Sequence, residues 1–172
     1  MKRQLFLAVA LAVAGAPLAA QQPDEDSIPV MRTVETSGPR VGITYISGPR
    51  AMARLAENDL AQWMSLFGWH FEQIVRPQRG GPALVTQEIL LVAGLDQGTA
   101  VPSLSFLVGI RTPGGWEFGV GPNLSPVGTG LVVGVGKSLR YGGVTIPLNL
   151  ALVTSKGALR TSFVVGYAVR RR

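Results

Sequence analysis

Apolar residues alternate with mostly small or polar residues through the second half of the chain. Five consecutive segments follow this rule with a period of two, which is the period of a β-strand that has one apolar face. Their ranges are 103–111, 116–121, 130–140, 144–153 and 158–170. Gly, Pro, Asn and Ser residues separate them, as expected for the turns of an antiparallel meander. The pattern therefore predicts neighbouring strands that share an apolar face.

Three earlier segments alternate less clearly: 41–45, 67–75 and 83–94. In the last of these, placing Ile89, Leu91 and Ala93 on the outer face also places Gln87 there, while Glu88 turns inward. Either a β-bulge shifts the register, or this strand faces protein instead of lipid. All the segments together predict an all-β fold, an eight-stranded antiparallel up-and-down barrel.

Residues 49–64 show a helical pattern between the first two predicted strands. Pro49 stands at the start, and a partial apolar stripe follows that consists of Ala51, Leu55, Leu60, Trp63 and Met64. The stretch is too polar to span a membrane. It predicts one short helix, either a cap on the barrel or a plug in its lumen.

The N-terminal residues have the three parts of a signal peptide. Lys2 and Arg3 precede an apolar run over 5–14, and Pro17 and small residues follow, which predicts a signal peptide at 1–20 with cleavage near Ala20. Residues 21–39 hold acidic residues and prolines without periodicity, and they predict a flexible leader. The barrel domain is then expected at 40–172.

The composition narrows the class of protein. The chain has 22 glycines, 15% charged residues and 47% hydrophobic residues, which is typical of a barrel whose outer wall faces lipid. It has no cysteine, so disulfide and thiolate zinc frameworks are excluded. The net charge of +6 is concentrated in the signal peptide and at Arg170–Arg172, so nucleic-acid binding is not expected.

The face opposite the apolar rows carries charged and amide side chains. In a narrow eight-stranded barrel these should pair with one another, so no through-pore is expected. The predicted lumen network consists of His70, Glu72, Glu88, Arg111, Glu117, Asn123, Arg140, Asn149 and Arg160. Glycines at 109, 119, 121, 134, 136 and 166 share this face, and they either permit close packing or leave space for the helix or an acyl chain.

Other motifs indicate no site. Gly134–Ser138 is rich in glycine and ends in Lys-Ser, but its spacing and its strand context do not fit a phosphate-binding loop. His70 and Glu72 share a strand face, which permits a catalytic pair, although a structural ion-pair network accounts for the same residues. No catalytic residue, metal ligand or cofactor is therefore predicted.

The region 101–172 resembles the small eight-stranded outer-membrane β-barrel proteins of Gram-negative bacteria and uncharacterised exported relatives. The resemblance is carried by Ser-Leu-Ser-Phe-Leu-Val-Gly-Ile-Arg at 103–111, Gly-Trp-Glu-Phe-Gly-Val-Gly-Pro-Asn-Leu-Ser at 115–125 and Ser-Phe-Val-Val-Gly-Tyr at 162–167. It implies an outer-membrane location, lipid as a partner, and a structural or surface-interaction role. Such barrels usually finish on an aromatic residue, whereas this chain ends in three arginines.

Two other functions remain open from the sequence. A periplasmic barrel that binds lipid or another hydrophobic ligand would turn the apolar rows inward. An enzyme acting on lipid would depend on His70 and neighbouring carboxylates. The direction of the apolar rows distinguishes the two barrel hypotheses.

Overall fold

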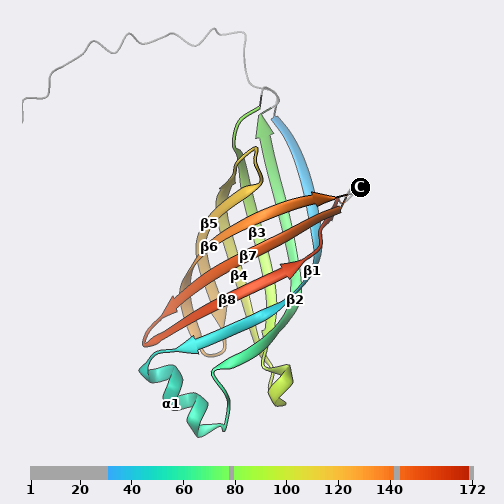
Figure 1. The fold of residues 1–172 in the computed structure, drawn as a ribbon. Helices are drawn as coiled ribbons and strands as arrows, with labels where there is room; N and C mark the ends of the chain where they lie inside the picture. Colours follow the sequence, from blue (N-terminus) through green and yellow to red (C-terminus); the bar gives the residue numbers. More distant parts are fainter. Residues whose placement is uncertain (1–30, 78–79, 142–143, 171–172) are drawn as a thin grey trace, which may run out of the picture.

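The alternating segments form the strands of a closed antiparallel barrel (Figure 1). The computed structural model describes residues 31–77, 80–141 and 144–170; the expected signal peptide and residues 21–30 of the expected leader lie outside them. The strands are β1 (Met31–Ser47), β2 (Trp63–Pro77), β3 (Ala83–Ala93), β4 (Val101–Arg111), β5 (Trp116–Ser125), β6 (Gly128–Tyr141), β7 (Val144–Ser155) and β8 (Ala158–Gly166). Each pairs with the next, and β1 also pairs with β8. The predicted fold class is confirmed.

Strand β1 begins at Met31, well before residue 40, so the expectation of a flexible leader is wrong for residues 31–39. These residues form a continuous ladder with β2, from Met31 opposite Pro77 to Tyr45 opposite Trp63. A two-residue strand β9 (Val169–Arg170) pairs with the same part of β1, beyond the end of β8. Residues 31–39 show no alternation of apolar and polar residues. Their place in the sheet follows from their pairing with β2 and β9.

The predicted helix exists but is shorter than 49–64. Helix α1 spans Pro49–Glu57, with Pro49 in its first turn, and Trp63 and Met64 belong to β2. Leu55 is buried against Met64 and Leu66 at one end of the barrel. Figure 1 shows α1 at that end, outside the ring of strands. The helix is therefore a cap and does not plug the lumen.

The two ends of the barrel differ. The start of β1 and the β4–β5 turn lie at one end, while α1 and the short 3-10 helix η1 (Leu95–Gln97) lie at the other (Figure 1). Gly115 in the β4–β5 turn has φ of 84°, a left-handed conformation that favours glycine. Among the described residues, no helix has the length and apolarity needed to cross a membrane.

The apolar rows of the last five strands point outward. On β6, Val133 is 51% exposed whereas its neighbour Val132, on the inner face, is 3% exposed. The outer rows of β4 to β8 include Phe106, Val108, Ile110, Phe118, Val120, Leu131, Val133, Leu139, Ile146, Leu150, Leu152 and Phe163, all of which are exposed. This direction contradicts the hypothesis of a periplasmic barrel with inward apolar rows.

Strand β3 points the other way from the expected assignment. Its ladders with β2 and β4 run without interruption, so no bulge shifts the register. Ile89 packs inward on Leu107, and Leu91 and Ala93 pack inward at the α1 end of the barrel. The inner wall is apolar there, which removes the contrast between faces on which the sequence pattern depends.

Candidate functional site

An ion-pair cluster crosses the lumen at the end of the barrel away from α1. Arg111 on β4 forms salt bridges with Glu72 on β2 and Glu117 on β5. Its Nε donates a hydrogen bond of 2.8 Å to Glu117 Oε1. All three side chains are buried. This guanidinium therefore joins strands on both sides of β3.

Neutral groups also bond the carboxylate oxygens of this cluster, including those that Arg111 already contacts. The Thr36 hydroxyl donates to Glu72 Oε2 at 2.9 Å, and the Ser138 hydroxyl donates to Glu117 Oε1 at 2.5 Å. The amide nitrogen of Gln87 donates to Glu72 Oε1 at 3.2 Å and to Glu117 Oε2 at 3.0 Å. A buried ion pair is tolerated when its lone pairs are bonded in this way. The predicted pairing of Glu72, Arg111 and Glu117 is observed.

A second buried pair joins β1 to β2. Arg40 donates from one terminal nitrogen to His70 Nδ1 at 2.5 Å, and from the other to the backbone carbonyls of Pro39 and Tyr167, each at 3.0 Å. Gly166 gives the Arg40 side chain its room, since a Cβ at that position would lie 2.9 Å from Arg40 Cδ. His70 thus bonds to a cation and has no orienting carboxylate among its described hydrogen bonds. The catalytic arrangement with Glu72 is not formed.

A third group lies nearer the α1 end. Arg160 on β8 donates to the Asn123 carbonyl oxygen at 2.7 Å, and the Asn123 amide nitrogen donates to the Ser105 hydroxyl at 2.8 Å. Thr44 and Ser162 share a hydrogen bond of 2.9 Å across the seam between β1 and β8. The predicted positions of Asn123 and Arg160 on the inner face are correct.

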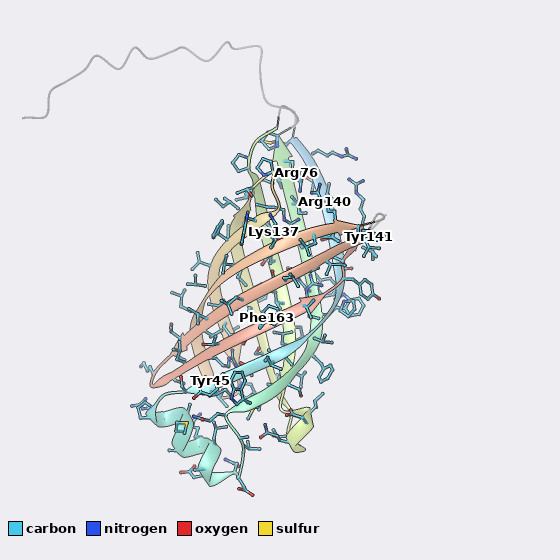
Figure 2. All side chains as sticks on the ribbon, in the orientation of Figure 1. Tyr45, Arg76, Lys137, Arg140, Tyr141 and Phe163 are labelled. Carbon is cyan, nitrogen blue, oxygen red and sulfur yellow. The ribbon has the colours of Figure 1, made fainter. Side chains whose placement is uncertain are left out.

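Two predicted members do not belong to the network. Glu88 is exposed on the outer face of β3, opposite Phe71 and Phe106 in the ladders. It was expected inside because the register of this strand was misread. Arg140 has the expected inward parity, but it is exposed at the barrel end, where Figure 2 shows it near Arg76.

Seven residues that bond within these three groups were absent from the predicted network: Thr36, Arg40, Thr44, Gln87, Ser105, Ser138 and Ser162. Thr36 lay in the expected leader, and Gln87 lay on the misread strand. Arg40 and Ser138 could have been found from the alternation of side chains along a strand, since each precedes an outward apolar residue, Val41 and Leu139 respectively.

The glycines of the inner wall accommodate larger side chains. A Cβ at Gly119 would lie 3.3 Å from Leu107 Cδ2, and one at Gly134 would lie 3.5 Å from the same atom. A Cβ at Gly136 would lie 2.1 Å from the amide oxygen of Asn149. Close packing, the first of the two interpretations of these glycines, therefore applies at these positions.

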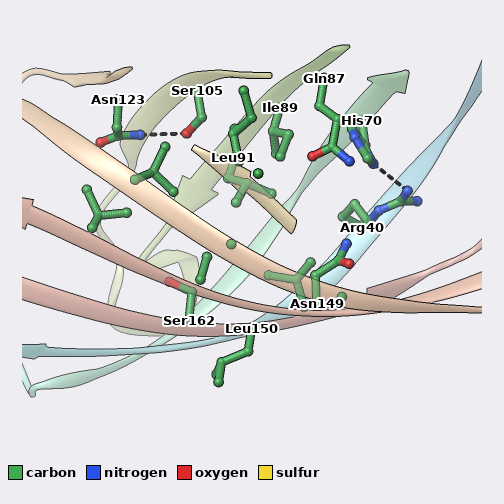
Figure 3. Close-up of a pocket in the computed structure, with 18 of the residues that line it drawn as sticks. Arg40, His70, Gln87, Ile89, Leu91, Ser105, Asn123, Asn149, Leu150 and Ser162 are labelled. Carbon is green, nitrogen blue, oxygen red and sulfur yellow. Dashed lines mark hydrogen bonds between the residues drawn. The ribbon is translucent and has the colours of Figure 1, made fainter. Parts of the chain in front are cut away.

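A cavity lies inside the barrel between the polar groups. Figure 3 shows Arg40 and His70 at one end, and Ser105 and Asn123 at the other. Its walls between them are largely apolar and include Ile89, Leu107, Val132, Val153 and Val164. The space open to the centre of a water-sized sphere is about 80 Å³. One water requires about 10–15 Å³ on this measure, so the cavity can hold several waters or a small ligand.

One sector of the outer wall is polar. Glu35, Ser37, Gln73, Thr86 and Glu88 line a hollow over β1, β2 and β3, which the inward-facing Thr36 and Glu72 also line. Phe71 borders the hollow. These three strands thus carry several polar side chains on the outer face, whereas the outer face of β4 to β8 is mainly apolar.

Among the described residues, no group of three or more His, Cys, Asp or Glu side chains is arranged to hold a metal ion. The acidic side chains of the interior are instead bonded to Arg111.

The comparisons with known proteins describe the architecture only. No family model matches the chain, and no curated protein matches its sequence. Among solved structures, Neisserial surface protein A has 10% identity and a TM-score of 0.47, with 78% of this chain and 96% of that protein covered. Ail, the attachment invasion locus protein of Yersinia pestis in complex with the heparin analogue sucrose octasulfate, has 11% identity and a TM-score of 0.46, with coverage of 80% and 99%. The barrel itself is established by the strand pairing described above.

Proposed function

We propose that the protein is an integral outer-membrane β-barrel with a structural or surface-interaction role. The observation that carries the proposal is the broad, mainly apolar outer face of β4 to β8, whose apolar side chains are exposed although a monomer in water rarely presents such a surface. A hydrocarbon environment removes the cost of this exposure. Membrane lipid is accordingly the first partner.

Aromatic residues at both ends of the apolar face support this placement. Tyr45 and Trp63 pack together near α1 with ring centroids 4.8 Å apart. At the other end, Trp116 and Tyr141 are exposed, and Lys137 Nζ lies 4.9 Å from the centre of the Trp116 ring. Figure 2 shows Phe163 between Tyr45 and Tyr141. Tyr and Trp prefer the two membrane–water interfaces, and Lys side chains near them extend towards the headgroups.

The interior supports a role other than conduction. The cluster of Glu72, Arg111 and Glu117 crosses the lumen, and Leu107 fills the space over Gly119 and Gly134. An ion crossing the barrel would have to separate buried, hydrogen-bonded charges. We therefore propose no through-pore.

The α1 end is the proposed contact surface, and it is internally bonded. Arg54 on α1 donates to the backbone carbonyl of Val127 in the β5–β6 turn at 3.2 Å. Asp96 in η1 accepts hydrogen bonds from the Ser65 hydroxyl at 2.6 Å and the Ser65 N–H at 3.0 Å. These two bonds hold the pKa of the Asp96 carboxyl below its ordinary value. In the usual orientation of such barrels, this end faces outward and the end with both chain termini faces the periplasm.

Cell fractionation of the full-length chain expressed in a Gram-negative host tests the proposal. We expect the processed protein in the outer-membrane fraction, extractable only with detergent, and migrating faster on a gel before boiling than after it. A known periplasmic protein and a known outer-membrane barrel in the same cells serve as the two fractionation controls. Recovery of the mature chain in detergent-free periplasmic extract would contradict the proposal.

A further inference from the structure

Two buried donors of the interior lack acceptors. Among the described residues, the buried side-chain nitrogen or oxygen atoms without a hydrogen-bond partner are Arg40 Nε and His70 Nε2. His70 is 2% exposed and Arg40 is 3% exposed. Buried polar groups are almost always paired, because an unpaired one loses its hydration without compensation. Both residues line the same cavity.

The hydrogen bond between the two residues fixes which nitrogen of His70 carries the proton. A guanidinium can only donate, so His70 Nδ1 accepts the bond from Arg40. The neutral ring must then carry its proton on Nε2. The unpaired atoms are therefore two N–H donors on adjacent side chains. An acceptor in the cavity would give both of them a hydrogen-bond partner.

The charge of the interior selects among acceptors. Of the described side chains that line the barrel interior, Arg40, Arg111 and Arg160 are cations, while Glu72 and Glu117 are the carboxylates. Both carboxylates are bonded to Arg111. Glu117 also lines the cavity, but its oxygens are taken by Arg111, Ser138 and Gln87. Arg40 is bonded only to neutral groups, so its charge lacks a direct partner.

We infer that the cavity beside Arg40 and His70 binds a small monovalent inorganic anion. The anion accepts from Arg40 Nε and His70 Nε2 and supplies the counter-charge that a buried guanidinium requires. Asn149, which lines the same cavity, carries an amide group able to donate to it. The cavity volume of about 80 Å³ accommodates a halide with accompanying water. This site is separate from the proposed contact surface at the α1 end and does not depend on it.

Bromide is the probe, because it replaces chloride and is located by anomalous X-ray scattering. The full-length mature protein is refolded in detergent in sodium bromide and crystallised. We expect an anomalous peak in hydrogen-bond contact with His70 Nε2 and Arg40 Nε. Ordered water at that position without anomalous signal, or bromide only on the outer surface, would overturn the inference.

Substitution gives a second, independent readout in solution. The dissociation constant for bromide is taken from the rise in the thermal midpoint at constant ionic strength, with gluconate as the replacement anion. Arg40→Gln and His70→Leu should each weaken bromide binding by at least about tenfold, as expected for loss of a charge-assisted or buried hydrogen bond. Lys137→Gln removes the same charge from the outer wall and should keep the wild-type constant. If Arg40→Gln does not fold, His70→Leu and the wild-type crystal decide the question, and equal bromide dependence in all folded variants rejects it.

Discussion

Arginine at position 133 tests whether the outer wall faces hydrocarbon. Val133 lies in the middle of β6, with Val120 and Leu152 beside it in the ladders, and all three side chains are exposed. Val127, in the β5–β6 turn at the α1 end, is a matched control, since it is 52% exposed against 51% for Val133. The two valines are equally exposed, so the same substitution places arginine against the proposed hydrocarbon at one site and in the turn at the other.

The two substitutions are expected to lower the free energy of unfolding by very different amounts. At the middle of a lipid-facing barrel wall, an arginine lowers the free energy of unfolding by about 2–4 kcal/mol. In the turn, where water solvates the guanidinium, an exposed substitution changes it by about 0.5 kcal/mol or less. A difference of about 3 kcal/mol is roughly a hundredfold change in the unfolding equilibrium constant.

The assay is guanidinium-induced unfolding of Val133→Arg, Val127→Arg and the unsubstituted protein in phospholipid vesicles, followed by tryptophan fluorescence. Reversibility is established by matching unfolding and refolding curves. Equal midpoints for the two variants would refute the assignment of the outer wall to lipid. A loss confined to Val133→Arg would support it.

Three further predictions concern the interior and the loop end. Arg111→Met should lower the free energy of unfolding by about 3–5 kcal/mol in the same assay, because it leaves Glu72 and Glu117 buried without their cation, and a smaller loss with Glu72→Gln added would confirm that origin. Leu55→Ala should lower stability by about 2 kcal/mol or more and raise trypsin cleavage within α1, while unchanged cleavage would show that the helix is not held by this contact. Because the pKa of Asp96 is lowered, the stability that its contact with Ser65 contributes should be fully present above the ordinary carboxyl pKa and be lost as the pH falls through the lowered pKa. Protection of the η1 amides from hydrogen exchange should fall over the same pH range, and Asp96→Asn should remove this pH dependence.

The later strands were predictable from the sequence because their faces differ in polarity along their whole length. On β7, for example, Leu150 and Leu152 are exposed to the outside, while Asn149 and Ala151 line the interior. Once the number of strands and the direction of the apolar rows are given, the inward position of Arg111, Glu117 and Arg160 follows from parity.

The first half of the chain was less predictable for a physical reason. Near α1 the inner wall is apolar, so Ile89 and Leu91 on β3 resemble outward residues in sequence although they pack inside. Thr36 lies in a strand segment that is polar on both faces, and only its pairing with β2 and β9 reveals it as a strand. Contacts distant in sequence decide both cases, and no local pattern encodes them.

The seam between β1 and β8 has a consequence for assembly. Gly42 lies opposite Val164, and Ser47 lies opposite Leu159, so the strand synthesised first must wait for the strand synthesised last. Until then one side of β1 and the free side of the growing sheet offer unpaired backbone groups to other chains. Pairing of such distant segments is intrinsically slow, and the long hairpin with β2 protects β1 on one side only. Completion of the ring is therefore a late step, and escort by a chaperone during transit would matter most before it occurs.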